Sequence, residues 1–487
     1  MENIFKGLEP ASVWNYFNEI LKVPNPSKQE EKIIAYLLDF GKKNNIDTKR
    51  DEIGNIVFTK PATPGYENRQ GVVLQGHMDM VCEKNSDVVF DFEKDAIIPR
   101  IVDGWVKATG TTLGADNGIA VAAMMAILTD NTIEHGPLEC LITVDEESGL
   151  TGAFALEEGF VKGKILLNMD NEDEGQFCIG CAGGKDTTST FTFEKEEIPA
   201  AHKSFELSVT GLNGGHSGDQ IDKGLGNSIK MINRILWFAS QEFGLRLADI
   251  KGGNLRNAIP REAFAKVLVP DAFVAEFKKF VLAFEKDLQA ECSVTEPNLI
   301  VSLKDIATPS YLIDELTQSE LLSALYACPH GVFAMSMEIP GLVETSTNLA
   351  TVKVKDNHII VGTSQRSSVE TAKEDVCSTV ASVFYLAGAD VEHSDGYPGW
   401  KPNSKSDIKN LMVERYKKMF NKEPHVLAIH AGLECGIIGE KYVGMDMISF
   451  GPTIKNPHSP DEMMEIASIP LFWKFLLDVL KNIPVKN

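Results

Sequence analysis

The feature that most constrains the fold is an alternation of short apolar runs with amphipathic helical patterns through residues 1–185. The runs GVVLQGH, ECLITVDEE and KILLNMD lack a polar residue at every second position, which is typical of parallel strands covered on both faces. The segments EEKIIAYLLDFGKKN and GADNGIAVAAMMAIL instead have helical spacing. Strands that alternate with helices predict an α/β domain with a mostly parallel central sheet.

The pattern changes in the middle of the chain. Strands such as SFELSVTG and HIIVGTSQR alternate polar with apolar positions and stand among long amphipathic helices, which predicts an inserted α+β domain. The stretch SDGYPGWKPNS is rich in Pro, Gly and Ser and is typical of a linker, after which α/β character resumes. We therefore expect a first domain formed by residues 1–185 and 399–487, and a second domain formed by residues 186–398.

The composition argues against several classes of function. With 69 acidic and 47 basic residues the formal charge is −22, which disfavours nucleic acid and anionic membranes as partners and is compatible with cation binding. The N-terminus has no secretory leader pattern, and no segment approaches about 18 uninterrupted apolar residues. The eight cysteines form no framework of the secreted type. We therefore expect a cytoplasmic protein that does not bind membranes.

Side chains of the kinds that bind metal ions follow several predicted strands or open turns. They are His77 and Asp79 after VVLQG, Asp116 in LGADNG, Glu146 and Glu147 after LITVD, Asp170 after ILLNM, and His458 in NPHSPDE. Each of them alone is typical of a helix cap or a surface loop. Ligands of an open parallel sheet bind outside the carboxyl ends of its strands, so we expect the set to converge there.

Such a set of side chains needs positive charge. Carboxylates packed together raise one another's pKa values unless cations are present. Two histidines with three carboxylates suit zinc, with cobalt or manganese as substitutes, and a two-metal site needs one ligand that both ions share. The sequence thus predicts a pair of divalent ions.

The same motifs, in order along the chain, resemble those of a known family. GHMDMV, LGADNG, DEES, NMD and NPHSPDE resemble the di-zinc M20 metallopeptidases, and the similarity is closest to the aminoacyl-histidine dipeptidases within that family. GCAGGKD, NGGHSGDQID, GGNLRNAIPREA, YPGWKPN and HAGLECG extend the similarity through essentially the whole chain. The resemblance implies a zinc-exopeptidase-type catalytic domain with an inserted lid domain, and a homodimer formed through that lid.

The resemblance also implies which side chains bind the two zinc ions. His77, Asp116 and Asp170 are expected to hold one ion. Asp116, Glu147 and His458 are expected to hold the other, so that Asp116 bridges the pair.

Two carboxylates beside these ligands have other implied roles. Asp79 is expected to accept a hydrogen bond from the far nitrogen of His77 and so fix its tautomer. Glu146 is expected to be the general base, which takes a proton from the attacking water and later hands it to the leaving amine. Asp145 keeps a structural interpretation, as a residue at the end of a strand.

Four residues outside the metal set are expected to meet the substrate. By resemblance His216 stabilises the oxyanion, from the partner subunit of a dimer, although its local sequence is also typical of a polar hairpin turn. Asn257 is expected to hold substrate, and Arg366 either clamps the terminal carboxylate or caps a strand end on the surface. For His430, which shares a motif with Glu434, packing near the site and recognition of the peptide amine both stay open.

The function that we expect from the sequence is hydrolysis of short unblocked peptides by a di-zinc dipeptidase, with Xaa-His dipeptides preferred. Other M20-type amidohydrolases, such as N-acyl amino acid deacylases and tripeptidases, have the same metal site and are the alternatives within the enzyme class. A catalytically inactive protein that binds metal or peptide is the alternative from another class. It predicts the loss of a ligand or of the base, whereas Glu146 and the five metal ligands are all present.

Overall fold

The computed structural model of the chain describes residues 3–486, which form two compact units. The first unit comprises the chain up to Cys181, Trp400–Ala428, and the chain from Leu433 onward. The second unit comprises Ala182–Gly399 and the short segment Ile429–Gly432. The sequence placed that short segment in the first domain, and nothing in its local pattern indicates that it packs with the second unit.

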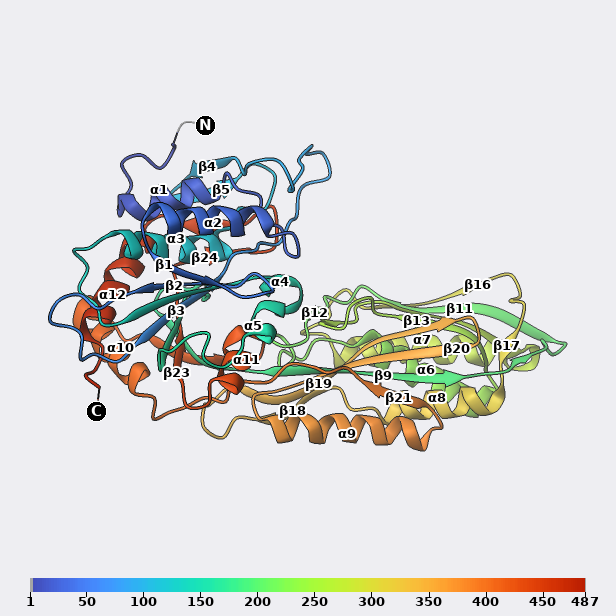
Figure 1. Cartoon of the computed structure of the whole chain (residues 1–487). Coiled ribbons are helices and arrows are strands. Elements are labelled where there is room, and N and C mark those ends of the chain that lie inside the picture. Colours follow the sequence, from blue (N-terminus) through green and yellow to red (C-terminus); the bar gives the residue numbers. More distant parts are fainter. Residues whose placement is uncertain (1–2, 487) are drawn as a thin grey trace. The chain divides into compact units, whose positions relative to one another are not determined.

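The first unit is built on an eight-stranded sheet with a parallel centre (Figure 1). In spatial order its strands are β1 (Asp47–Arg50), β2 (Ile56–Lys60), β6 (Leu138–Thr143), β3 (Val72–His77), β7 (Ile165–Asn168), β23 (Asp446–Ser449), β8 (Gln176–Cys181) and β22 (His425–Ile429). Strands β6, β3, β7 and β23 are parallel to one another. Every residue of β3, β6 and β7 is buried, because helices and neighbouring segments cover both faces. This confirms the predicted α/β fold with its mainly parallel sheet.

The helices of the first unit follow from the sequence patterns. They are α1 (Ala11–Ile20), α2 (Glu31–Lys43), α3 (Ala115–Thr129), α4 (Glu146–Gly149), α5 (Thr151–Ala155), α10 (Asp407–Phe420), α11 (Glu434–Lys441) and α12 (Ser468–Asn482). Helix α3 is apolar on all sides and is buried from Ala115 to Leu128, because it lies between α1 and strand β3. Helix α3 therefore begins inside the protein, where side chains at its first turn can build a site.

A small sheet joins two distant parts of the first unit. Its strands are β24 (Ile454–Lys455), β25 (Met463–Glu465), β5 (Trp105–Ala108) and β4 (Pro99–Val102), in that order. Strand β25 pairs with β5 in an antiparallel register in which Met463 lies opposite Lys107. The sheet thereby brings the β24–β25 hairpin beside the segment that leads into α3.

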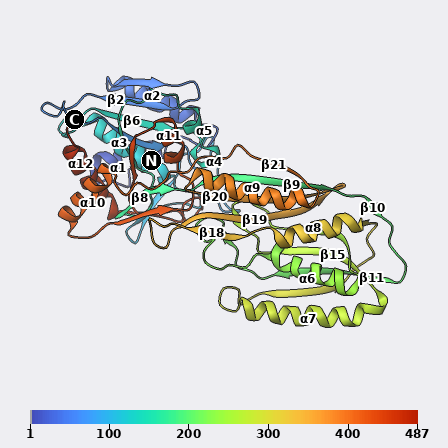
Figure 2. The same ribbon diagram turned by 90° about the horizontal axis from the view of Figure 1, so that it is seen from below.

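The second unit has α+β architecture. Its main sheet contains β16 (Ile300–Asp305), β11 (His202–Thr210), β15 (Ala263–Pro270), β13 (Arg246–Gly252), β19 (Val343–Lys355), β20 (His358–Ser367), β9 (Gly183–Thr192) and β21 (Asp390–His393) in spatial order, with β18 (Gly331–Met335) paired to β19. Figure 2 shows the long helices of this unit, α6 (Ser228–Phe243), α7 (Val274–Glu291), α8 (Glu315–Ala327) and α9 (Glu370–Leu386), on the sheet. Residues of these helices and of the strands form one apolar core. The inserted α+β domain is therefore confirmed.

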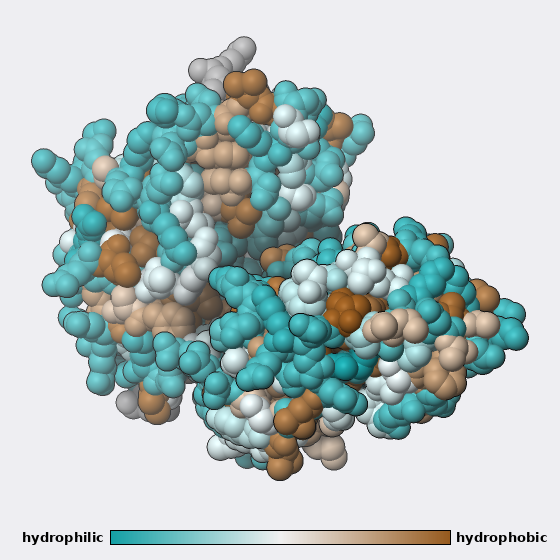
Figure 3. Space-filling view, turned by 90° about the vertical axis from the view of Figure 1, so that its right-hand side faces the viewer, coloured by the Kyte–Doolittle hydropathy of each residue, from teal (hydrophilic) through white to brown (hydrophobic). Residues whose placement is uncertain are grey.

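The surface is mostly polar on the face that Figure 3 presents, where hydrophilic residues predominate and apolar residues form small separate groups. Within residues 3–486, no helix combines the length and the apolar character needed to cross a membrane.

Candidate metal centre

The predicted metal ligands of the first unit meet at the carboxyl end of the parallel strands. His77 is the last residue of β3, and Asp170 follows the end of β7, which pairs with β3. Glu146 and Glu147 follow β6, which pairs with β3 on its other side. Since these three strands are adjacent and parallel, their following residues arrive at one edge of the sheet.

Asp116 lies between two histidines that come from distant parts of the chain. Its Oδ1 lies 3.2 Å from His77 Nε2, and its Oδ2 lies 3.3 Å from His458 Nε2. His77 Nε2 also lies 3.3 Å from Asp170 Oδ1, and His458 Nε2 lies 3.0 Å from Glu147 Oε2. The five side chains therefore form two groups, and each group uses a different oxygen of Asp116.

The donor atoms of these groups are close enough to share ions. The atoms of His77, Asp116 and Asp170 lie within 4.8 Å of one another, and so do those of Asp116, Glu147 and His458. Glu147 Oε1 is buried and has no hydrogen-bond partner among residues 3–486. An unpaired buried carboxylate oxygen is costly unless a cation is beside it. The residues therefore fit a pair of dications with Asp116 as the shared ligand.

The electrostatics of the cluster also favour bound cations. Burial alone lowers the pKa of His77, but the charge of Asp170 and hydrogen bonds with Asp116 and Asp170 raise it well above its usual range. Burial raises the pKa of Asp170 to about 7 and raises the pKa of Glu146 well above its usual range. Burial thus makes Asp170 and Glu146 harder to ionise, and dications would offset this because they stabilise the ionised form.

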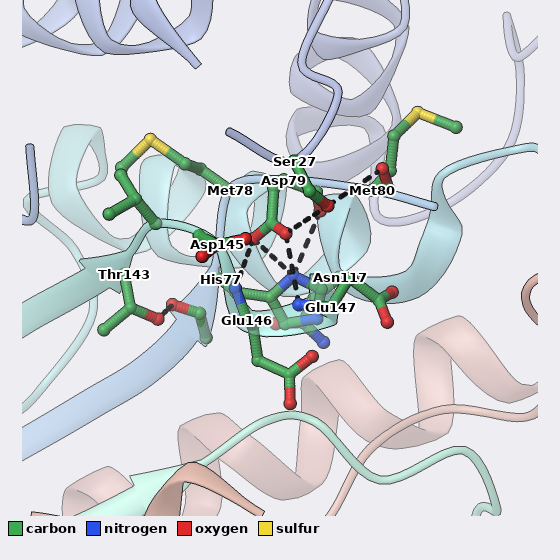
Figure 4. A network of polar contacts seen from close by, with 12 residues as sticks. Ser27, His77, Met78, Asp79, Met80, Asn117, Thr143, Asp145, Glu146 and Glu147 are labelled. Carbon is green, nitrogen blue, oxygen red and sulfur yellow. Dashed lines mark hydrogen bonds and ion pairs between the residues drawn. The ribbon is translucent and has the colours of Figure 1, made fainter. Parts of the chain in front are cut away.

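Asp79 connects the histidine of one strand end to the carboxylates of the next. His77 Nδ1 lies 3.0 Å from the carbonyl oxygen of Asp79 and 3.4 Å from its carboxylate. The backbone N–H groups of Glu146 and Glu147 donate to the Asp79 carboxylate, at 3.0 and 3.2 Å. Figure 4 shows these residues grouped around Asp79. This position suits the orienting role that the resemblance implies.

Two residues of the α1–α2 connection support this group and were missed by the sequence analysis. Ser27 Oγ donates to Asp79 at 2.7 Å, and Glu30 Oε1 accepts from the backbone N–H of Asp145 at 3.0 Å. Asp145 has a left-handed backbone conformation with φ 49°, so the turn after β6 depends on such support. The local signal, Ser27 followed three residues later by Glu30, is typical of a helix capping box and does not indicate these long-range bonds.

Glu434, at the start of α11, lies buried beneath the ligands. Its Oε2 accepts from Gln75 Nε2 at 2.6 Å and from Thr143 Oγ1 at 2.7 Å. Gln75 and Thr143 belong to the same strand ends as the metal ligands, two positions before His77 and Asp145. Burial raises the pKa of Glu434 to about 7. The structure thus places Glu434 in a polar layer directly below the metal layer, where it bonds to two strands.

The second unit holds the four predicted substrate residues. His216 lies in β12 (Gly215–His216), which pairs with β14 (Ala258–Ile259), so the segment is not the local hairpin that its sequence also suggests. The Nδ1 of His216 accepts from the backbone N–H of Asp219 at 3.1 Å. The carbonyl oxygen of Asn257 accepts from the N–H of Ser217 at 2.8 Å. His216 and Asn257 are therefore neighbours within this unit.

Arg366 and His430 are also close to each other within the second unit. Arg366 is only 8% exposed, so it does not cap a strand end on the surface, and its Nη1 donates to the hydroxyl of Tyr397 at 2.9 Å. Ser346 lies opposite Arg366 in the sheet and contacts His430 Nε2 at 2.7 Å through its Oγ. Burial and the charge of Arg366 lower the pKa of His430 to about 4.

Arg366 and Asn257 line one cavity of about 270 Å³, together with Arg256 and Tyr397. Asp186 also lines the cavity, and its Oδ2 lies 3.6 Å from Arg256 Nε, so Arg256 is already paired. Arg366 Nε is buried and has no hydrogen-bond partner among residues 3–486, so this guanidinium group suits a bound carboxylate.

Comparison with known proteins agrees with this geometry. Residues 73–482 match the family described as Peptidase family M20/M25/M40. The chain is 44% identical, over 479 residues, to the cytosol non-specific dipeptidase of Escherichia coli (strain K12), a match that covers 98% of this chain and 99% of that protein.

Solved structures show the same relationship. An aminoacylhistidine dipeptidase from Vibrio alginolyticus superposes with a TM-score of 0.91 at 44% identity, covering 99% of this chain and 98% of that one. A tripeptidase from Staphylococcus aureus, at 17% identity and a TM-score of 0.57, covers 98% of this chain and 99% of its own, and shares the fold. The family match spans most of the sequence and the first relative spans nearly all of it. The chain therefore belongs to peptidase family M20/M25/M40.

Proposed function

We propose that this chain is a metallopeptidase that hydrolyses unblocked dipeptides, with Xaa-His dipeptides as preferred substrates. The observation that carries the proposal is Asp116, whose two carboxylate oxygens face His77 and His458 while Glu146 lies beside the same cluster. Similarity along nearly the whole chain to an E. coli dipeptidase and a Vibrio aminoacylhistidine dipeptidase supports the choice of substrate.

The metal centre is proposed to hold two zinc ions, with cobalt or manganese as substitutes. One ion is assigned to His77, Asp116 and Asp170, and the other to Asp116, Glu147 and His458, because these groups have converging donor atoms. Imidazole and carboxylate donors suit zinc. When bound, such ions polarise a carbonyl group and make water more acidic.

Glu146 is proposed to act as the general base. Its side chain lies with those of His77 and Glu147 within 4.8 Å, so it can reach a water molecule at the centre. It takes one proton from the attacking water and delivers it to the amine that leaves when the peptide bond breaks. Asp79 keeps His77 and the Glu146–Glu147 turn in place through the bonds described above.

The residues of the second unit keep their predicted roles as proposals. His216 is proposed to stabilise the oxyanion, and Arg366 to bind the substrate carboxylate together with Asn257. The burial of Arg366, its unpaired Nε and its position in a cavity that Asn257 also lines support this. His430 is buried and contacts Ser346, which lies opposite Arg366, and this supports packing near the site over recognition of the peptide amine.

The assembly is proposed to be a homodimer formed through the second unit, in the cytoplasm. Strand β18 supports the dimer, because Val332, Phe333 and Met335 on it are at least 39% exposed and β18 lies off the main path of the sheet. The eight cysteines are all free thiols, which fits a reducing compartment. Light scattering on the purified chain tests the dimer.

A substrate panel tests the activity. Gly-His, β-Ala-His and Ala-Ala should be hydrolysed, and prior removal of metal with a chelator should stop the reaction until zinc is restored. Acetylated amino acids and tripeptides should be poor substrates. Preferred hydrolysis of an acetylated amino acid would point to a deacylase, and preferred hydrolysis of tripeptides to a tripeptidase. No turnover by the zinc-loaded chain would favour an inactive binding protein.

A further inference from the structure

Glu462 makes an unusual set of hydrogen bonds at the start of helix α3. Its Oε2 accepts from the backbone N–H groups of Leu113 and Gly114, at 2.7 and 3.0 Å. Its Oε1 accepts from those of Ala115 and Asp116, at 2.8 and 3.3 Å. The side chain is only 2% exposed. One buried carboxylate therefore satisfies four consecutive N–H groups, the last of which belongs to the residue that bridges the two metal groups.

The start of α3 needs such a partner from elsewhere in the chain. The N-cap is Gly114, which has no side chain with which to cap the helix. Its backbone is left-handed, with φ 72°, and a Cβ at this position would lie 2.8 Å from the sulfur of Met80. Glycine is therefore required. Asp116 has a non-helical backbone, with φ −81° and ψ 105°, so the N–H groups from Leu113 to Asp116 need an acceptor from outside this segment. Glu462 supplies that acceptor.

The same carboxylate belongs to the segment that carries His458. Glu462 lies four residues after His458, in the hairpin between β24 and β25. Strand β25 pairs with β5, so this hairpin is anchored next to the turn that leads into α3. His458 itself has a left-handed backbone with φ 58° and a side chain that is 51% exposed, so its own packing does not hold it firmly.

An ionised carboxylate is costly to bury beside Asp116, and the four N–H donors offset that cost. Only an ionised carboxylate offers two oxygens that can each accept two bonds in this geometry. A glutamine amide at this position would turn its own NH₂ group toward two of the backbone N–H donors.

We propose that Glu462 is a positioning residue that holds the Asp116 turn against the His458 hairpin, so that Asp116 can bind both dications at once. The inference rests on the two-metal site of the proposed function and on no assumption about the substrate. Without Glu462 the two segments can separate, and the dication bound by Asp116, Glu147 and His458 loses affinity first, because His458 is the ligand on the exposed hairpin.

The test compares Glu462→Gln with Glu139→Gln in the full chain. Glu139 is a matched control: it is also a buried glutamate, and its Oε2 accepts from the backbone N–H groups of Lys162 and Gly163 at 2.8 and 2.7 Å, away from the metal ligands. Each chain is stripped of metal, and zinc binding is then titrated by calorimetry and by competition with a chromophoric chelator. The shift of the melting temperature on adding zinc is measured in parallel.

Glu462→Gln should weaken the more weakly held zinc ion by about 10- to 100-fold and reduce the zinc-dependent shift of the melting temperature. Glu139→Gln should lower the melting temperature of the metal-free chain but bind both ions with wild-type affinity. Glu462→Asp keeps the charge with a shorter reach and should fall between Glu462→Gln and wild type. If Glu462→Gln does not fold, Glu462→Asp carries the same comparison.

Wild-type zinc affinity for both ions in Glu462→Gln or, where that variant does not fold, in Glu462→Asp would overturn the inference and reduce Glu462 to a helix cap. A chain whose binding of two zinc ions depends on Glu462, but which hydrolyses no dipeptide, would instead overturn the proposed function and leave this inference standing.

Discussion

The two halves of the metal centre are built in different ways. The His77 half is formed at the ends of buried parallel strands, and the His77 side chain is 1% exposed. The His458 half depends on a hairpin of two very short strands, and the His458 side chain is 51% exposed. Both halves share Asp116.

Because of this difference, the two halves should contribute differently to the stability of the fold and to metal binding. Buried polar groups at strand ends contribute to the fold as well as to the site, because removing one leaves its buried partners unpaired. An exposed ligand on a hairpin contributes to ion binding while its loss leaves the core intact. We therefore expect replacement of His77 to affect folding and metal binding together, and replacement of the exposed His458 to affect metal binding alone.

The largest expected effect is on catalysis and belongs to neither half. Glu146→Gln should lower kcat by about 10²- to 10⁴-fold, because the general base is lost. Zinc content should stay at two ions per chain, because Glu146 is assigned to neither ion. The measurement is dipeptide hydrolysis combined with metal analysis of the same sample. Turnover near the wild-type rate would remove Glu146 from its proposed role.

The next effect distinguishes the two halves directly. His77→Ala should destabilise the metal-free chain by about 3–5 kcal/mol, because it leaves buried carboxylates without their histidine partner. His458→Ala should change that stability by no more than about 1 kcal/mol, because its side chain is half exposed. Urea unfolding of both metal-free variants measures the difference, and zinc titration should show that each has lost tight binding. Equal destabilisation by the two substitutions would contradict the comparison.

The polar layer below the His77 half should give the chain a pH-dependent stability. The pKa of Glu434 is raised to about 7 by burial, whereas an exposed glutamate titrates near about 4.3. Because the folded pKa is the higher one, the stabilising contribution is complete below about pH 4.3 and is lost as the pH rises through about 7. The whole change amounts to about 4 kcal/mol.

Glu434→Gln should remove this dependence, because glutamine keeps an acceptor for Gln75 and Thr143 but does not titrate. The measurement is urea unfolding of the metal-free wild type and variant between pH 5 and pH 8. The stability difference between the two proteins should shift in favour of the variant as the pH rises. Parallel curves would show that Glu434 does not titrate in this window.

The same contrast explains how much the sequence could predict. The runs that become β3, β6 and β7 are long enough for their apolar pattern to indicate buried parallel strands, and the α/β fold with an inserted α+β domain is confirmed. The residues that follow these strands could be placed at one sheet edge from the pattern alone. The partners of Asp116 and His458 came from resemblance to a family, because strands of two or three residues, such as β24 and β25, give no periodic signal.

The supporting residues could not be predicted from any local pattern. Glu462 acts on backbone groups 346 to 349 positions away in the sequence, and Ser27 bonds to a carboxylate 52 positions away. Both contacts depend on tertiary packing, and the backbone N–H groups that Glu462 binds carry no residue identity. The local signal around Glu30 indicates a helix cap. The same carboxylate can accept either from backbone N–H groups of its own helix or from those of the turn after β6, and the sequence does not distinguish the two.

The smallest expected effect compares one hydroxyl in each half. Ser27→Ala removes the bond to the Asp79 carboxylate in the His77 half and should cost about 1.5 kcal/mol of stability, because a bond to an ionised acceptor is lost. Ser459→Ala removes two exposed bonds of the His458 hairpin, in which Ser459 Oγ donates to the carbonyl of Asn456 and accepts from the N–H of Asp461, and should cost about 0.5 kcal/mol or less. Urea unfolding of the metal-free variants gives both values.

The two hydroxyls should also differ in their effect on catalysis. Because Asp79 holds the turn of Glu146 and Glu147, Ser27→Ala should lower kcat, whereas Ser459→Ala should leave kcat near wild type. The reverse order would show that the hairpin, and not the strand ends, controls the geometry of the centre.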